Sequence, residues 1–140
     1  MFLDKDGKEI DNPDPNSGLY VKSRQGQVVK AIIPKDCLAF QMGETEQIHS
    51  GGLLQATPHC VHAGGIPDIS RETFAVFMEP EFDESMALPS GATVEETTEG
   101  SGTKYMPKGV PALASRWKSD YDFGTFTNAT LAAYHPEDQK

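Results

Sequence analysis

The chain has little positive charge, few cysteines and no long apolar run. Lys and Arg number 12 against 21 Asp and Glu, and the resulting net charge of -9 disfavours a nucleic-acid partner. Two cysteines, Cys37 and Cys60, are too few for a disulfide framework, and we expect both to be small buried hydrophobes. No run approaches the roughly 20 apolar residues that span a bilayer, so no membrane partner is expected. No secretory signal is visible at the N-terminus, which favours a cytoplasmic location.

What is present is a series of short apolar segments separated by turn residues, the pattern of a sandwich or barrel. We expect a hairpin of strands 19–23 and 28–33, because Gly26 between them can adopt the positive φ of a tight turn. A further strand is expected at 37–42, and the polar residues 44–52 are expected to form a loop.

The stretch 53–82 carries the candidate chemistry, and it is expected to form two strands joined by the loop 63–69. Side chains alternate along a strand, so Arg71 and Thr73 share one face of the second strand. A guanidinium and a hydroxyl spaced in this way can clamp a carboxylate. The alternatives are a solvated face for this pair and, for His59 in the first strand, a hydrogen-bonded core histidine.

The order of these segments resembles that of the iron(II)- and 2-oxoglutarate-dependent dioxygenases, in the isopenicillin N synthase-like branch. The resemblance covers roughly residues 19–82. Its motifs are LAFQMG at 38–43, SGG at 50–52, ATPHCV at 56–61 and RET at 71–73. Two departures are Gln41, where many members have Asn, and Cys60, where Arg is common.

The resemblance implies a mainly β fold, part of a double-stranded β-helix (jelly roll), followed by a C-terminal helix. It implies that His59 is the distal Fe(II) ligand and that Arg71 and Thr73 bind the far carboxylate of 2-oxoglutarate, the co-substrate. No His-x-Asp motif, which supplies the other two ligands in this family, occurs in the chain. We therefore expect the chain to be the C-terminal part of an oxidoreductase that acts on a small-molecule substrate, with the N-terminal half of the same domain as a partner.

Two alternatives remain open. Members of this branch can use the Arg-x-Ser/Thr pair for a substrate carboxylate, without 2-oxoglutarate. The chain could also be a catalytically silent jelly-roll module that binds a small carboxylate or a protein partner. The missing His-x-Asp motif supports this second alternative.

The remainder of the chain suggests three parts: the jelly-roll portion 1–83, an acidic polar loop 84–104, and a C-terminal arm and helix 105–140 that pack on the barrel. The helix is expected at 122–134, where apolar residues recur at helical spacing. His49, His62 and His135 are expected to be solvated or hydrogen-bonded, without a metal.

Overall fold

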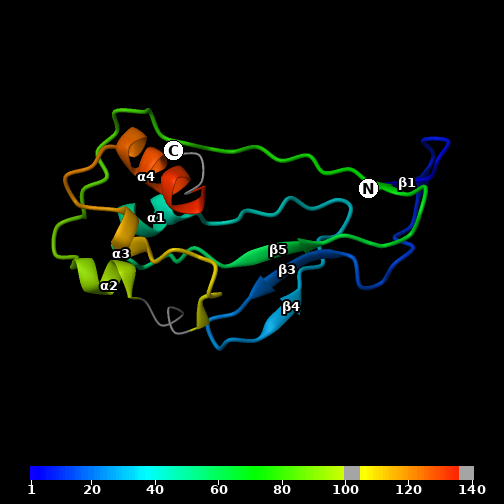
Figure 1. Ribbon diagram of the computed structural model, residues 1–140, viewed down its shortest axis with the longest axis horizontal. Coiled ribbons are helices and arrows are strands. Elements are labelled where there is room, and N and C mark those ends of the chain that lie inside the picture. The colour runs from blue at the N-terminus through cyan, green and yellow to red at the C-terminus, as the bar shows by residue number, and fades with distance from the viewer. Residues whose placement is uncertain (100–104, 136–140) are drawn as a thin grey trace.

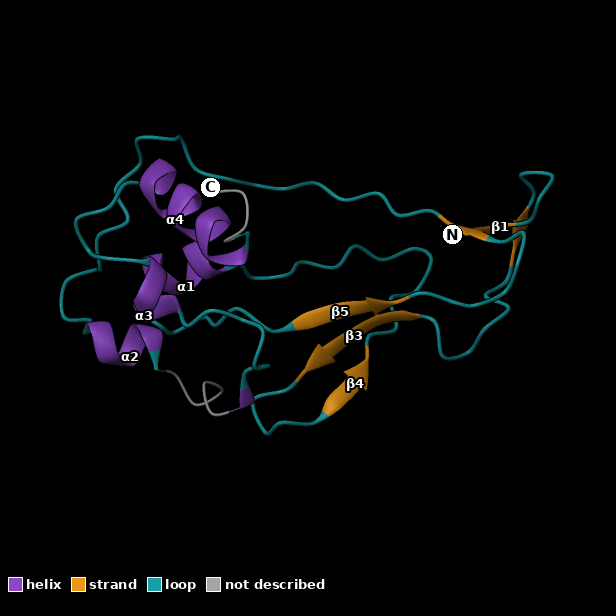
Figure 2. Cartoon of the chain, in the orientation of Figure 1, coloured by secondary structure: helices purple, strands orange, loops and turns teal. Residues whose placement is uncertain are grey.

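The computed structural model describes residues 1–99 and 105–135, and these contain two small antiparallel sheets and a group of helices (Figures 1 and 2). The strands are β1 (Phe2–Leu3), β2 (Glu9–Ile10), β3 (Gly18–Lys22), β4 (Val28–Lys30), β5 (His59–His62) and β6 (Ser70–Arg71). The helices are α1 (Glu44–His49), α2 (Val94–Thr98), α3 (Leu113–Arg116) and α4 (Phe123–Tyr134). The fold is thus of mixed content, and within the described residues neither sheet closes into a barrel.

The larger sheet has the strand order β4-β3-β5 and contains the predicted hairpin. Gly26 in its turn has a φ of +82°, and the ring of Tyr105 lies where a Cβ would be. β4 ends at Lys30, earlier than the predicted strand end at residue 33. β5 pairs antiparallel with the other edge of β3, with His59 opposite Val21.

The second sheet has the order β2-β1-β6 and pairs Arg71 with Phe2 at the start of the chain. The loop 63–69 lies between β5 and β6, as predicted. The two strands that it joins belong to different sheets, so residues 53–82 do not form the single two-stranded unit that their pattern suggested.

Within the described residues the predicted strand 37–42 is absent, and the strand predicted after the loop 63–69 is only the two residues of β6. Residues 37–42 and 72–82 run as extended loops that belong to neither sheet (Figure 2). Their apolar side chains are exposed, and Leu38 and Phe74 reach 88% and 91% exposure. Cys37 and Cys60 are exposed as well, which contradicts their predicted burial. The physical reason is that no described strand pairs with 37–42 or 72–82, and the few contacts that these segments make, such as that of Gln41 with His59, leave their apolar side chains exposed.

The helices gather at the end of the molecule opposite β1 (Figure 1) and form the helical cluster. Its core is apolar and consists of Ile48, Met86, Leu113, Trp117, Phe123 and Phe126. The predicted loop 44–52 is therefore wrong, because α1 buries Gln47 and Ile48 there. The predicted loop 84–104 contains α2, which has a capping box of Thr93 and Glu96. Residues 100–104 of that loop lie outside the described residues.

α4 confirms the predicted C-terminal helix, with Asp122 as its N-cap. α4 contributes Phe123 and Phe126 to the core of the helical cluster, and it does not pack on a barrel. The preceding arm is partly helical, since α3 occupies 113–116. None of the helices in 1–99 and 105–135 combines the length and apolar character needed to cross a bilayer.

The Asp122 cap is expected to make stability depend on acid pH. Hydrogen bonds from the side chain of Thr125, and next from its backbone N–H, hold the pKa of Asp122 below its ordinary value. A carboxyl whose folded pKa is lowered stabilises the fold above its unfolded pKa of about 4, and this contribution disappears as the pH falls through the folded pKa. Asp122→Asn keeps a capping oxygen but does not titrate.

We expect wild type to exceed Asp122→Asn in unfolding free energy at pH 6 and to lose that advantage below pH 3. Urea unfolding at several pH values measures the difference between the two proteins. A difference that stays constant across this range would contradict the assignment of Asp122 as a charged cap.

Candidate functional site

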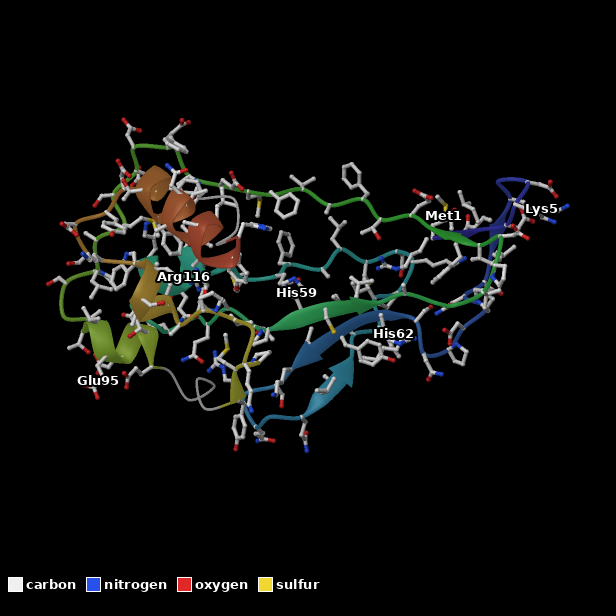
Figure 3. All side chains as sticks on the ribbon, in the orientation of Figure 1. Met1, Lys5, His59, His62, Glu95 and Arg116 are labelled. Atoms are coloured by element: carbon white, nitrogen blue, oxygen red, sulfur yellow. The ribbon has the colours of Figure 1, made fainter. Side chains whose placement is uncertain are left out.

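His59 begins β5, the edge strand of the larger sheet, and its ring is exposed (Figure 3). Its Nδ1 lies 3.1 Å from the backbone carbonyl oxygen of Thr57 and also contacts the side-chain carboxamide of Gln41. Within the described residues, Nε2 has no hydrogen-bond partner. Metal-binding histidines ordinarily donate the second ring N–H to a carbonyl or carboxylate. The Thr57 carbonyl supplies such an acceptor and leaves Nε2 available to a ligand.

The approach to β5 is fixed by a buried glutamine that the sequence did not identify. Gln47 of α1 accepts a hydrogen bond from the backbone N–H of Ala56 at 2.9 Å and donates one to the Thr97 carbonyl at 2.7 Å. The helical cluster thereby holds the chain three residues before His59. A lone Gln in a polar stretch carries no recognisable signal, because its partners are 9 and 50 residues away.

Arg71 lies at a cavity of about 280 Å³ between the start of the chain and the loop 63–69. The lining is mostly apolar and comprises Phe2, Pro13, Asp14, Ser17, Val61, Ala63, Gly64, Ile66, Ile69 and Arg71. Among the described residues, the Arg71 guanidinium has no hydrogen-bond or ion-pair partner. Asp14 is the acidic group in the lining, and its Oδ1 already accepts a backbone hydrogen bond from Asn16 at 2.8 Å. A small carboxylate with an apolar body suits this combination of an unpaired cation and apolar walls.

The position of Val61 shows on which side of the larger sheet His59 and the Arg71 cavity lie. It lies two residues after His59 in β5 and lines the Arg71 cavity. Because alternate side chains of a strand point to the same face, His59 and Val61 share one face, at a spacing of roughly 7 Å. The ring of His62 contacts Tyr20, with 6.3 Å between ring centroids, on the opposite face. His59 and the Arg71 cavity therefore lie on the same side of the larger sheet.

The structure does not bring every predicted residue together. Thr73 is exposed, follows β6 and does not line the Arg71 cavity. His59 does not line it either. His49 contacts the Ser85 carbonyl through Nε2 at 3.0 Å, as expected for a hydrogen-bonded histidine.

An iron(II) facial triad needs two histidines and one carboxylate. In 1–99 and 105–135 no group of three or more His, Cys, Asp or Glu side chains is arranged to hold a metal ion. His59 fits the requirements for one ligand. The chain's described residues therefore do not fit a complete iron site, and two further ligands would have to come from elsewhere.

A second cavity, of about 250 Å³, lies between the β3–β4 hairpin and the helical cluster. Lys22, Arg24, Glu44, Gln47 and Glu99 are among its lining residues. Its lining mixes both signs of charge and contains no predicted site residue. We therefore take the Arg71 cavity and His59 as the candidate site.

No protein-family profile, curated protein or solved structure matches this chain.

Proposed function

We propose that this chain supplies the distal-histidine part of a non-haem iron(II), 2-oxoglutarate-dependent oxygenase with a jelly-roll fold, acting on a small molecule. In this proposal His59 is one iron ligand, through Nε2, and Arg71 binds the far carboxylate of 2-oxoglutarate, with Thr73 as a second donor. The observation that carries the proposal is the placement of His59 and the Arg71 cavity on one side of the larger sheet.

The chemistry of the cavity supports a carboxylate ligand. A guanidinium without a partner among the described residues can make two parallel hydrogen bonds to a carboxylate, and the apolar lining residues can contact the carbon atoms of the ligand. The volume of about 280 Å³ is near the lower limit for small-molecule sites, which suits a ligand of a few carbon atoms. Bound iron(II) and 2-oxoglutarate would activate O2, the oxidant, whereas the residues of this chain would bind and orient them.

The uncovered apolar side chains support a partner that completes the domain. One extended segment precedes His59 in sequence and the other follows Arg71. Both carry exposed apolar side chains, namely Leu38, Phe40, Phe74, Val76, Phe77 and Met78. Exposed apolar side chains in this number mark an interaction site, and β5, which Gln41 of the first segment contacts, has a strand edge that is unpaired within the described residues. The N-terminal half of the same domain is the proposed partner, and it would also provide the two missing iron ligands.

Anaerobic iron(II) titration tests the proposal. The full chain by itself is expected to bind iron(II) weakly, because one imidazole is a poor site. The same chain preceded by the segment encoded upstream is expected to bind one iron tightly, and His59→Ala is expected to weaken that binding at least tenfold. Equal binding by wild type and His59→Ala would reject the assignment.

The Arg71 assignment makes a separate prediction. In the extended protein, Arg71→Ala is expected to raise the apparent dissociation constant of 2-oxoglutarate by roughly 10- to 150-fold, because a hydrogen-bonded charged contact contributes about 1.5–3 kcal/mol. Arg24→Ala removes the same charge from an exposed hairpin position and serves as the control. Isothermal titration calorimetry measures both constants. Small, equal changes would contradict the clamp, and a change confined to substrate affinity would favour a substrate carboxylate at Arg71.

A catalytically silent jelly-roll module is the second candidate, and the incomplete iron site favours it. In that case Arg71 would bind a small carboxylate and His59 would remain a hydrogen-bonded histidine. Carboxylate binding by the extended protein without iron binding would distinguish this module from the oxygenase.

A further inference from the structure

Gln41 contacts the ring of His59 across 18 residues of sequence. It belongs to the extended segment 37–42 and is itself exposed. Its carboxamide nitrogen lies against Nδ1, the same ring nitrogen that lies 3.1 Å from the Thr57 carbonyl oxygen. One ring nitrogen thus has two protein partners, while Nε2 has none within the described residues.

The Thr57 contact indicates which nitrogen carries the proton. A backbone carbonyl can only accept a hydrogen bond, so the Thr57 contact requires a proton on Nδ1. With Nδ1 protonated, the Gln41 carboxamide must be rotated so that its oxygen, in place of its nitrogen, faces the ring, because an N–H group would otherwise face another N–H group. The oxygen and nitrogen of a side-chain amide are interchangeable by rotation, which allows this orientation. Both neighbours then accept from the same N–H, and Nε2 keeps its lone pair.

We infer that Gln41 is a positioning residue that holds the neutral His59 ring in its Nδ1–H form, with Nε2 unprotonated and directed to a ligand. The preference for one protonated nitrogen depends only on contacts within this chain. Its use for an iron ion rests on the proposed function. Because residues 37–42 are unpaired, this contact is also a direct link between that segment and the edge strand β5.

Nitrogen NMR of the full chain tests the inference without any metal. At pH about 9, where histidine side chains are ordinarily neutral, long-range proton–nitrogen spectra report the ratio of Nδ1–H to Nε2–H forms for each ring. His59→Asn assigns the His59 signals among the four histidines of the chain. Gln41→Leu removes the acceptor, and Gln41→Glu offers only acceptor oxygens. Gln25→Leu, at an exposed position of the hairpin turn, is the matched control.

We expect His59 to be mainly Nδ1–H in wild type and in Gln25→Leu. Gln41→Leu should lower the ratio of Nδ1–H to Nε2–H roughly two- to tenfold, the effect of one neutral hydrogen bond. Gln41→Glu should restore or exceed the wild-type ratio. An unchanged ratio in Gln41→Leu, or a ratio in Gln41→Glu lower than in wild type, would overturn the inference. The indole signal of Trp117 verifies that each variant retains the helical cluster.

The outcome is separable from that of the proposed function. If the ratio responds to Gln41 but iron(II) does not bind the extended protein, the positioning role stands and the oxygenase proposal fails. If iron(II) binds with the same affinity in wild type and Gln41→Leu, and the ratio is also unchanged, Gln41 has no positioning role. Weaker iron(II) binding by Gln41→Leu with the ratio shifted supports both.

Discussion

Glu44→Ala is expected to destabilise the helical cluster by about 3 kcal/mol, the largest effect of any single charge removal that we foresee in this chain. Glu44 begins α1 and accepts a hydrogen bond from Arg116 of α3 at 2.6 Å. The Arg116 side chain is 1% exposed, whereas that of Glu44 is 25% exposed. Removal of the carboxylate would leave a buried cation without its counter-charge, and this is why the expected loss is large.

The other contacts of Arg116 limit the loss. Its guanidinium also donates to the Pro111 carbonyl and to the hydroxyl of Thr130, and it lies 6.0 Å from the ring centre of Phe126. These contacts satisfy most of the remaining donors, so the effect should lie at the low end of the 3–5 kcal/mol that is typical of broken buried pairs. Arg116 therefore ties together α1, α3 and α4 in one network.

The control for Glu44 is Glu46→Ala, at an exposed position in the same first turn of α1. Both carboxylates interact favourably with the helix N-terminus, so this contribution cancels between them. The Glu46→Ala control should lower the free energy of unfolding by at most about 0.5 kcal/mol.

Combining Glu44→Ala with Arg116→Met should cost less than the sum of the two single changes, because neither charge is then left unpaired. Urea unfolding followed by Trp117 fluorescence measures all four free energies, and additive costs would contradict the pairing.

Trp117→Ala is expected to destabilise the chain by about 3–5 kcal/mol, as for other large buried aromatics. Trp117 is 3% exposed and packs with Met86 and Phe123 in the core. Its indole Nε1–H also donates to the Met86 carbonyl at 3.0 Å in a buried hydrogen bond. The Trp117 side chain thus combines apolar packing with a hydrogen bond to the backbone of Met86, which precedes α2.

Trp117→Phe separates the two contributions. It retains most of the apolar surface but leaves the Met86 carbonyl without its donor, which is expected to cost about 1–3 kcal/mol. Circular dichroism measures both variants, because the fluorescent ring is lost. A cost for Trp117→Phe equal to that for Trp117→Ala would contradict the packing contribution, because the ring that Phe retains would then add no stability beyond that of Ala.

Phe74→Ala is the contrasting substitution. At 91% exposure it should change the stability of the full chain by less than about 0.5 kcal/mol. In the extended protein the same change should cost several times more if the proposed N-terminal half covers Phe74. The comparison therefore reports whether the uncovered surface becomes a core when the domain is complete.

The stability of the helical cluster bears directly on the candidate site. Ile48 of α1 is fully buried in that core, and its neighbour Gln47 fixes the backbone of Ala56 ahead of β5. We infer that loosening of α1 would release the approach to His59. The buried apolar core of the described chain lies in the helical cluster, whereas the candidate site residues His59 and Arg71 lie on the strands β5 and β6.

The sequence by itself determined those features that depend on near neighbours. Gly26 permits the hairpin turn whatever surrounds it, and Asp122 followed by helical apolar spacing is enough to begin α4. The loop 63–69 was likewise predictable from its Gly and Pro residues. The alternation of side chains predicted Arg71 and Thr73 on one face of a single strand, but β6 ends at Arg71 and does not include Thr73.

Only the tertiary structure decided the rest. Helices as short as α1 and α2 are marginal by themselves, so their existence depends on the core that they share and not on their own residues. Apolar segments such as 37–42 become strands only where another strand pairs with them, and within the described chain none does. The contact between Gln41 and His59, and the shared side of His59 and the Arg71 cavity, arise because segments distant in sequence are brought together by folding, which local patterns do not encode.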